Sequence, residues 1–110
     1  MMVFVAADKN LKDRTKQFAL CVMRLYRALP RREEARIIGR QVLRSGTSVG
    51  ANYRAACRVW SKAEFVAKLG IVLEEADETV FWLELLQESS LVSAQKLAPL
   101  VKDGNSPRFS

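Results

Sequence analysis

Residues 31–58 read RREEARIIGRQVLRSGTSVGANYRAACR, and this stretch decides the fold. At 100° per residue, its apolar side chains gather on one side of a single projected helix and most of its arginines on the other. The apolar side consists of Ile38, Val42, Val49, Tyr53 and Ala56. The opposite side, named here the arginine stripe, consists of Arg32, Arg36, Arg40, Arg44, Arg54 and Arg58. The pattern predicts one long amphipathic helix with a core-facing side and a guanidinium-bearing side.

The weak point of this helix is its middle, residues 45–52, which is rich in small residues. Each glycine costs roughly 1 kcal/mol relative to alanine in a helix interior, so two short helices with a break between them are an alternative. The apolar side and the arginine stripe keep their phase across the glycines, and small residues allow close helix–helix approach. We therefore expect a continuous helix over residues 31–58.

A first helix is expected over residues 10–28, because its apolar residues follow the four-three spacing of a bundle seam. Asn10 is the expected N-cap, and Pro30 ends the helix because the residue before a proline disfavours the α region. The seam consists of Leu11, Thr15, Phe18, Val22, Leu25 and Leu29.

A third helix is expected over residues 62–88, since Ser61 and Glu64 match a capping box. Its seam consists of Phe65, Leu69, Val72, Ala76, Thr79, Leu83 and Leu86. A second apolar row lies on a different side of this helix and is formed by Ile71, Trp82 and Leu85. This row is either additional core or a subunit interface, and its separation from the seam favours an interface.

A short fourth helix is expected over residues 93–102, although Pro99 should kink or shorten it. With no credible strand, the expected fold is an all-α, antiparallel up-and-down four-helix bundle. The expected organisation is an N-terminal extension (1–9), one bundle domain (10–103) and a disordered C-terminal tail (104–110). A chain of 110 residues with 49% hydrophobic residues suits one such domain.

The composition argues against an enzyme, because the chain contains no histidine, the commonest general base and a common metal ligand. The nearby glutamates Glu74, Glu75 and Glu78 therefore lack the histidine partners of a di-iron bundle. No glycine-rich phosphate loop occurs, so no cofactor and no metal are expected. Charges interrupt every apolar run, which excludes a segment of about 20 apolar residues that would span a membrane. Two widely separated cysteines, Cys21 and Cys57, are expected to be buried free thiols of a cytoplasmic protein.

The net charge of +6 favours a polyanionic partner such as RNA or DNA. Arginine grips phosphates and carboxylates alike with its two-pronged donor fork. Because the third helix is strongly acidic, the arginine stripe has two open readings: ion pairing within or between subunits, or an exposed phosphate-binding surface. Trp60, near the turn before the third helix, is expected to plug that turn, with a base-stacking platform as the alternative.

Residues 37–86 contain three motifs that together resemble a known protein family. The small-residue segment 44–52, RSGTSVGAN, is followed by SKAEF at 61–65 and by the acidic stretch EEADET at 74–79. These pieces, in this order, resemble the bacterial four-helix bundle family of the 23S rRNA intervening-sequence protein, which includes the accessory variability protein of diversity-generating retroelements. The resemblance implies a ring-like homopentamer. For the retroelement branch, it also implies binding of nucleic acid and of a reverse transcriptase.

We therefore predict a non-enzymatic, homo-oligomeric accessory protein that binds RNA or DNA phosphates. The alternative is a protein–protein scaffold whose arginines serve subunit assembly. The residues assigned to nucleic-acid binding are Lys12, Lys16, Arg27, Arg32, Arg36 and Arg40. The residues assigned to an oligomer interface are Arg44, Arg54, Arg58, Ile71, Glu75, Glu78, Trp82 and Leu85.

Overall fold

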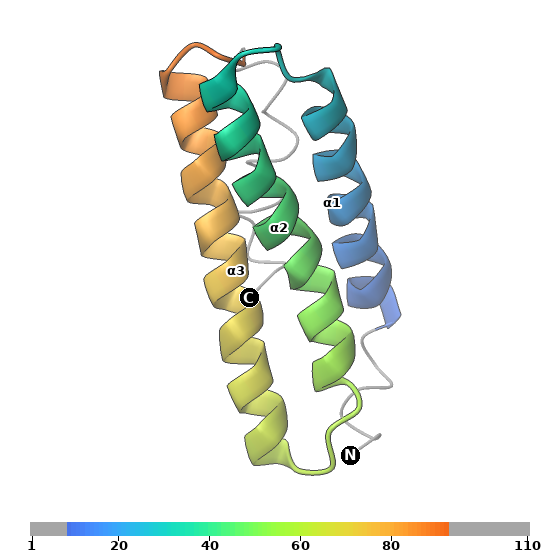
Figure 1. Ribbon diagram of the computed structural model, residues 1–110. Coiled ribbons are helices and arrows are strands. Elements are labelled where there is room, and N and C mark those ends of the chain that lie inside the picture. The colour runs from blue at the N-terminus through green and yellow to red at the C-terminus, as the bar shows by residue number, and fades with distance from the viewer. Residues whose placement is uncertain (1–8, 93–110) are drawn as a thin grey trace.

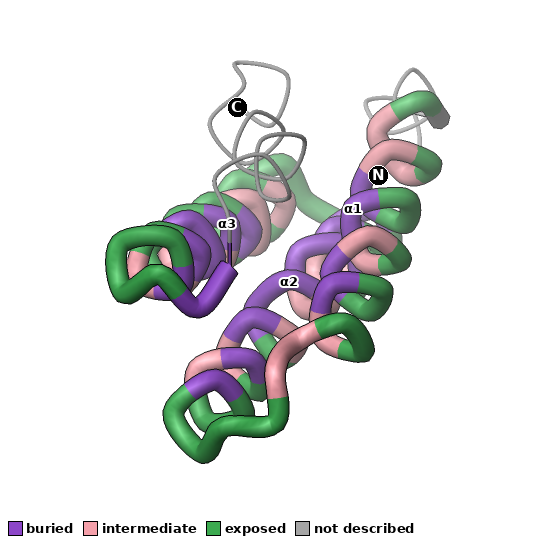
Figure 2. Tube along the Cα trace, turned by 90° about the horizontal axis from the view of Figure 1, so that it is seen from above, coloured by how far each residue is buried: buried purple, intermediate pink, exposed green. Residues whose placement is uncertain are grey.

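The computed structural model describes residues 9–92, which form three α-helices joined by short turns. Helix α1 spans Lys9–Ala28, α2 spans Glu33–Ala56 and α3 spans Lys62–Glu88. Successive helices run in opposite directions beside one another (Figure 1). Helix α2 packs along both of the others, whereas α1 and α3 share no contact of comparable extent (Figure 2). The central helix is therefore the one that carries the arginine stripe.

The expected four-helix bundle is wrong for the described residues, which are all-α but contain three helices. The fourth helix was expected over residues 93–102, which lie outside the described residues, as do residues 1–8 and the expected tail, 104–110. That expectation rested on three apolar residues around Pro99, a pattern too short to define a helix on its own. A ring-like homopentamer is not shown by the structure of this single chain.

Helix α2 is continuous through its small-residue middle, as the sequence predicts. The hydroxyls of this segment bond back to carbonyls one turn earlier: Ser45 donates to Gln41 at 2.8 Å and Thr47 to Leu43 at 2.7 Å. These bonds satisfy polar groups within the helix itself. The alternative of two short helices with a break between them is therefore wrong.

The glycines of α2 are the places where α1 comes close. A Cβ atom added at Gly46 would lie 3.0 Å from the Val22 side chain, and one added at Gly50 would lie 3.3 Å from the Thr15 hydroxyl. Both distances are tighter than most real Cβ contacts, so an alanine at either position requires its neighbour to shift. The absent side chains allow the two helices to pack closely.

The core lies on the shared inner sides of the three helices (Figure 2). The predicted apolar residues of α2 are buried except Ile38, which is half-buried. On α3 the predicted seam is buried from Val72 to Leu86, while Phe65 and Leu69 pack against the core in part. The seam predictions are therefore confirmed.

The helix ends test the capping predictions. Helix α1 begins at Lys9, so Asn10 lies inside the helix and its assignment as N-cap is wrong. The predicted box at the start of α3 is confirmed, because the Glu64 N–H donates to the Ser61 hydroxyl at 3.1 Å. Helix α3 ends in a Schellman motif, in which Ser90 adopts φ 65° and Leu91 N–H donates to Leu86 O at 3.1 Å.

Candidate nucleic-acid interface

The arginine stripe faces away from the core, and all six of its arginines are exposed. Arg32 is the N-cap of α2 and Arg58 lies in the following turn, so four of the six belong to the helix itself. The stripe covers roughly a third of the helix circumference. One of its edges lies beside α1 and the other beside α3, and the two edges have different surroundings.

On the α3 edge, Arg44 is held by carboxylates of the same chain. Its guanidinium forms ion pairs with Glu75, at 3.4 Å, and with Glu78. Its Nε also donates to Gln41 Oε1 at 3.1 Å. Trp82 joins this cluster because its indole N–H donates to Glu78 Oε2 at 3.0 Å. Ion pairing is therefore the correct reading for Arg44.

This cluster contains four of the residues assigned to an oligomer interface, namely Arg44, Glu75, Glu78 and Trp82. The structure brings these four together within one chain. Of the remaining interface residues, Ile71 is exposed and Leu85 is half-buried on α3. Their contact with a second subunit stays a prediction.

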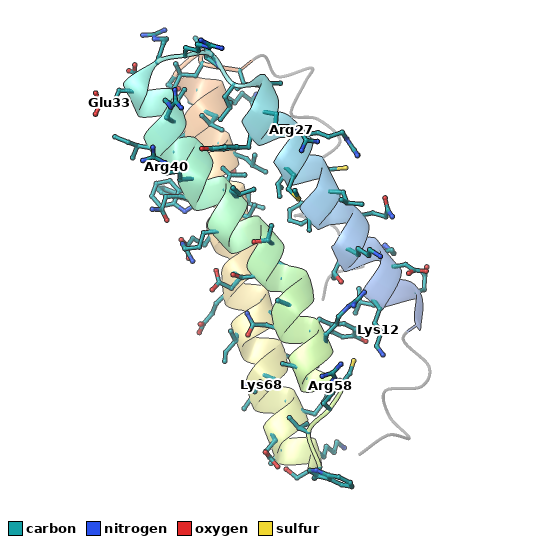
Figure 3. All side chains as sticks on the ribbon, turned by 45° about the vertical axis from the view of Figure 1, so that its right-hand side comes forward. Lys12, Arg27, Glu33, Arg40, Arg58 and Lys68 are labelled. Carbon is teal, nitrogen blue, oxygen red and sulfur yellow. The ribbon has the colours of Figure 1, made fainter. Side chains whose placement is uncertain are left out.

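On the α1 edge, two grooves follow the seam between α1 and α2. The first lies where α1 turns into α2, and we name it the turn groove. It has a volume of about 200 Å³ and is lined by Tyr26, Arg27, Leu29, Pro30, Arg31 and Arg36. Three arginines from α1, the turn and α2 therefore border one concave site. Figure 3 shows Arg27 at this end of the molecule.

The second groove lies further along the same seam, and we name it the glycine groove. It has a volume of about 250 Å³ and is lined by Thr15, Lys16, Ala19, Thr47, Gly50, Ala51 and Arg54. Lys16 supplies one cation from α1 and Arg54 supplies another from α2. Small residues form much of its lining, so the groove exists because α2 lacks bulky side chains there.

The two grooves contain three of the residues assigned to nucleic-acid binding: Lys16, Arg27 and Arg36. Among the described residues, the ion pairs of the structure involve none of these three, nor Arg31 or Arg54. No carboxylate of the described residues therefore neutralises these five cations.

The other assigned residues are not brought to a groove. Arg32 pairs with Glu34 at 3.3 Å on the exposed first turn of α2. Arg40 is exposed on α2, and Lys12 is half-buried near the opposite end of the molecule, where Figure 3 also shows Arg58. The predicted set therefore divides between the grooves and scattered surface positions.

Sequence reasoning missed Arg31 and placed Arg54 in a different role. A projection of α2 alone identifies its outward side but does not say which edge borders α1. Lys16 and Arg27 of α1 are also basic, so the sequence contains the cations that α1 contributes to the grooves. Pairing them with the arginines of α2 requires the register between the two helices. Gly46 and Gly50 supply that register once their contacts with Val22 and Thr15 are known.

Trp60 does not plug the turn as expected, because its side chain is 82% exposed. The neighbouring Val59 is half-buried. The two cysteines also differ: Cys57 is buried as expected, whereas Cys21 is only half-buried.

Residues 9–92 contain no group of three or more histidine, cysteine or acidic side chains suited to a metal ion. No helix in the same range is long and apolar enough to cross a membrane.

Comparisons with known proteins agree with the all-α fold. A family model described as the 23S rRNA-intervening sequence protein matches residues 8–106. The chain belongs to this family. A member of the S23 ribosomal protein family from Bacteroides thetaiotaomicron, described as a protein of unknown function, is 39% identical in sequence. Its crystal structure superposes with a TM-score of 0.79 over 84% of this chain and 86% of that chain.

A comparison with curated proteins gives no match. Membership of the 23S rRNA-intervening sequence protein family confirms that part of the resemblance seen in the sequence. The link to diversity-generating retroelements stays a prediction.

Proposed function

We propose that this 23S rRNA-intervening sequence family protein is a non-enzymatic accessory protein that binds RNA or DNA through phosphates. The binding surface is the seam between α1 and α2. One observation carries the proposal: two grooves on this seam are bordered by cations that no carboxylate of the described residues neutralises. Such cations attract an anionic chain and release its counterions on binding.

The spacing of the grooves suits an extended polyanion. Arg36 and Arg54 lie in the same phase on α2 and are about five turns, or about 27 Å, apart. At 3.4 Å per nucleotide step of a duplex strand, this corresponds to about eight steps. One strand or duplex of this length reaches both grooves at once, whereas a shorter one reaches only one of them.

The chemistry of the seam favours binding without sequence preference. Arginine and lysine contacts to phosphates position a nucleic acid but do not read its bases. The net charge of +6 adds long-range attraction. Because the family takes its description from an intervening sequence of 23S rRNA, structured RNA is the first ligand to test.

The test is a filter-binding titration of structured RNA from about 50 mM to about 200 mM salt. The wild-type protein should bind with micromolar affinity that falls steeply with salt. The double variant Arg36→Gln/Arg54→Gln should bind about tenfold more weakly, and its salt slope should be smaller by roughly two phosphate contacts. Arg44→Gln is the matched control, because its guanidinium is already held by Glu75 and Glu78.

Two results contradict the proposal. The first is no binding at about 50 mM salt by folded protein. The second is an equal loss of affinity in the control and the double variant, because that would remove the α1–α2 seam from the binding surface.

A second candidate function, a protein–protein scaffold, is favoured by a different surface. Helix α3 exposes four large apolar side chains to solvent: Val66, Ile71, Leu73 and Phe81. Contiguous exposed apolar patches mark protein-binding surfaces, and Val66, Leu73 and Phe81 fall within about 80° of one another around the helix. A second copy of the chain or another polypeptide, such as a reverse transcriptase, would cover them.

Light scattering distinguishes this candidate. The scaffold predicts an oligomer of the purified chain, or a stable complex with its partner, that Phe81→Asp weakens. A monomer that binds RNA but no polypeptide contradicts the scaffold and leaves the nucleic-acid proposal standing.

A further inference from the structure

We propose that the turn groove binds the terminal phosphomonoester of a nucleic-acid strand, an inference that rests on the proposed function. Three arginines border this one groove instead of lying in a row along one helix. Arg27 comes from the last turn of α1, Arg31 from the connecting turn and Arg36 from the first turns of α2. The other exposed arginines of α2 are spaced along its axis.

The convergence leaves a local excess of positive charge. No ion pair joins these three arginines to a carboxylate within the described residues. The acidic residues nearest in sequence are Glu33 and Glu34. Glu34 is paired with Arg32, and Figure 3 shows Glu33 on the opposite side of α2 from Arg27. An anion in the groove would therefore meet several guanidinium groups and no competing carboxylate of this turn.

The charge of the ligand follows from this arrangement. A phosphomonoester carries about −1.5 to −2 charges at pH 7 and presents three acceptor oxygens. A phosphodiester within a strand carries a single charge. Three guanidinium forks around one site match the larger charge and the larger number of acceptors. The groove thus favours a strand end over a position inside the strand.

The size of the groove agrees with a terminal group. Its volume of about 200 Å³ lies below the range of about 300–1,000 Å³ that is usual for small-molecule sites. A phosphate and part of its sugar fit such a volume better than a complete nucleotide cofactor does. Tyr26 adds an aromatic wall beside the arginines, and Gly39 leaves room for it, since a Cβ added there would lie 3.2 Å from its ring.

The remainder of the strand has a path along α2. Arg40 follows Arg36 by one turn, and the glycine groove with Lys16 and Arg54 lies further along the α1–α2 seam. A strand whose end occupies the turn groove would therefore place internal phosphates near these cations. This continuity favours a nucleic acid over a phosphorylated protein as the source of the monoester.

The test compares three single-stranded RNAs of one sequence and about 12 nucleotides, long enough to reach both grooves. One carries a 5′-phosphate, one a 3′-phosphate, and one has hydroxyls at both ends. Fluorescence anisotropy should show about tenfold tighter binding of a phosphate-ended RNA than of the hydroxyl-ended RNA. The preferred end identifies the strand polarity. The preference should fall below about pH 6, where the dianionic monoester takes up one proton and becomes a monoanion.

Arg31→Gln is the decisive variant, because Arg31 lies in the turn and outside the arginine stripe. It should reduce the preference for a phosphate end to about one, while it weakens binding of the hydroxyl-ended RNA only as much as the loss of one phosphate contact does in Arg40→Gln. The matched control Arg40→Gln should weaken all three RNAs equally and keep the preference. Circular dichroism of both variants confirms that the helices are intact.

The possible failures are distinguishable. Equal, salt-dependent binding of all three RNAs by the wild-type protein overturns recognition of strand ends and leaves the proposed function standing. No binding of any RNA overturns both. A phosphoserine peptide that binds more tightly than every RNA overturns the assignment of the groove to nucleic acid.

Discussion

The two seams of α2 differ in chemistry although one helix supplies half of each. The α1–α2 seam packs closely because Gly46 and Gly50 lack side chains, and it is bordered by cations that form no ion pair within residues 9–92. The α2–α3 seam contains a buried hydrogen bond between Thr79 and Ser45, at 2.8 Å, and is bordered by ion pairs of Arg44. The same arginine stripe therefore ends in a basic groove on one side and in a neutralised cluster on the other.

This difference shows that the neighbour of an arginine decides its role. Arg44 and Arg54 occupy the same helix and are both exposed, yet only Arg44 lies beside an acidic helix. Variants that perturb the packing of one seam should leave the contacts of the other seam unchanged. The following substitutions test that separation, in order of decreasing effect on the free energy of unfolding.

Gly50→Val should damage the α1–α2 seam most. Its Cβ would meet the Thr15 hydroxyl at 3.3 Å and the Thr15 carbonyl oxygen at 3.4 Å, and backbone does not move as freely as a side-chain tip. Overpacking of this kind should lower the free energy of unfolding by about 2–3 kcal/mol, measured by urea denaturation. Gly70→Val is the matched control, because a Cβ at Gly70 meets nothing within 4 Å. The control should be neutral or stabilising by about 0.5 kcal/mol, and an equal loss in both variants would refute close packing as the cause.

Thr79→Val tests the α2–α3 seam. The Thr79 hydroxyl lies 2.8 Å from Ser45 Oγ and 2.7 Å from the Glu75 carbonyl, and both Thr79 and Ser45 are buried. Its loss should cost about 1 kcal/mol. A double-mutant cycle with Ser45→Ala should give a coupling energy of about 0.5–1 kcal/mol.

The control for this cycle is Thr47→Val, because the hydroxyl of Thr47 bonds only to carbonyls of its own helix. Its effect should add to that of Thr79→Val without coupling. Strict additivity of Ser45→Ala and Thr79→Val would show that the hydroxyl pair does not stabilise the seam.

Arg44→Gln should have the smallest effect, because its ion pairs are partly exposed and surface pairs contribute about 0–1 kcal/mol. We expect a loss of about 0.5 kcal/mol at low salt that disappears near 1 M salt, where charges are screened within about 3 Å. Arg36→Gln should not change the free energy of unfolding under either condition. A loss in Arg44→Gln that is independent of salt would point to packing instead of charge.

Much of the fold follows from the sequence because the repeating patterns are long. The seams of α1, α2 and α3 keep their period over many turns, and Ser61 with Glu64 marks the start of α3 correctly. The fourth helix was predicted from a short pattern interrupted by Pro99. Short patterns do not separate a helix from other structure, and residues 9–92 contain three helices instead of the four expected for the bundle.

The candidate site was only partly predictable, for a geometric reason. A helical projection of α2 gives the outward direction of Arg36, Arg44 and Arg54 but not which helix flanks each of them. That assignment depends on the register and order of neighbouring helices, which are long-range properties. The exposure of Trp60 differs from the expectation for a local reason: in a turn of few residues, a single step along the chain exchanges inward and outward positions, and the neighbouring Val59 is the half-buried residue.

The two tryptophans give the molecule a built-in spectroscopic contrast. Trp60 is 82% exposed in the turn between α2 and α3, whereas Trp82 is half-buried and donates its indole N–H to Glu78. An exposed indole emits at longer wavelength and is quenched readily by a dissolved quencher, while a half-buried one is shielded. In Trp60→Phe the remaining emission would come from Trp82 alone, one hydrogen bond away from the carboxylate that binds Arg44. The fluorescence of Trp82 would then report, without an attached label, whether the ion pair between Arg44 and Glu78 is formed in solution.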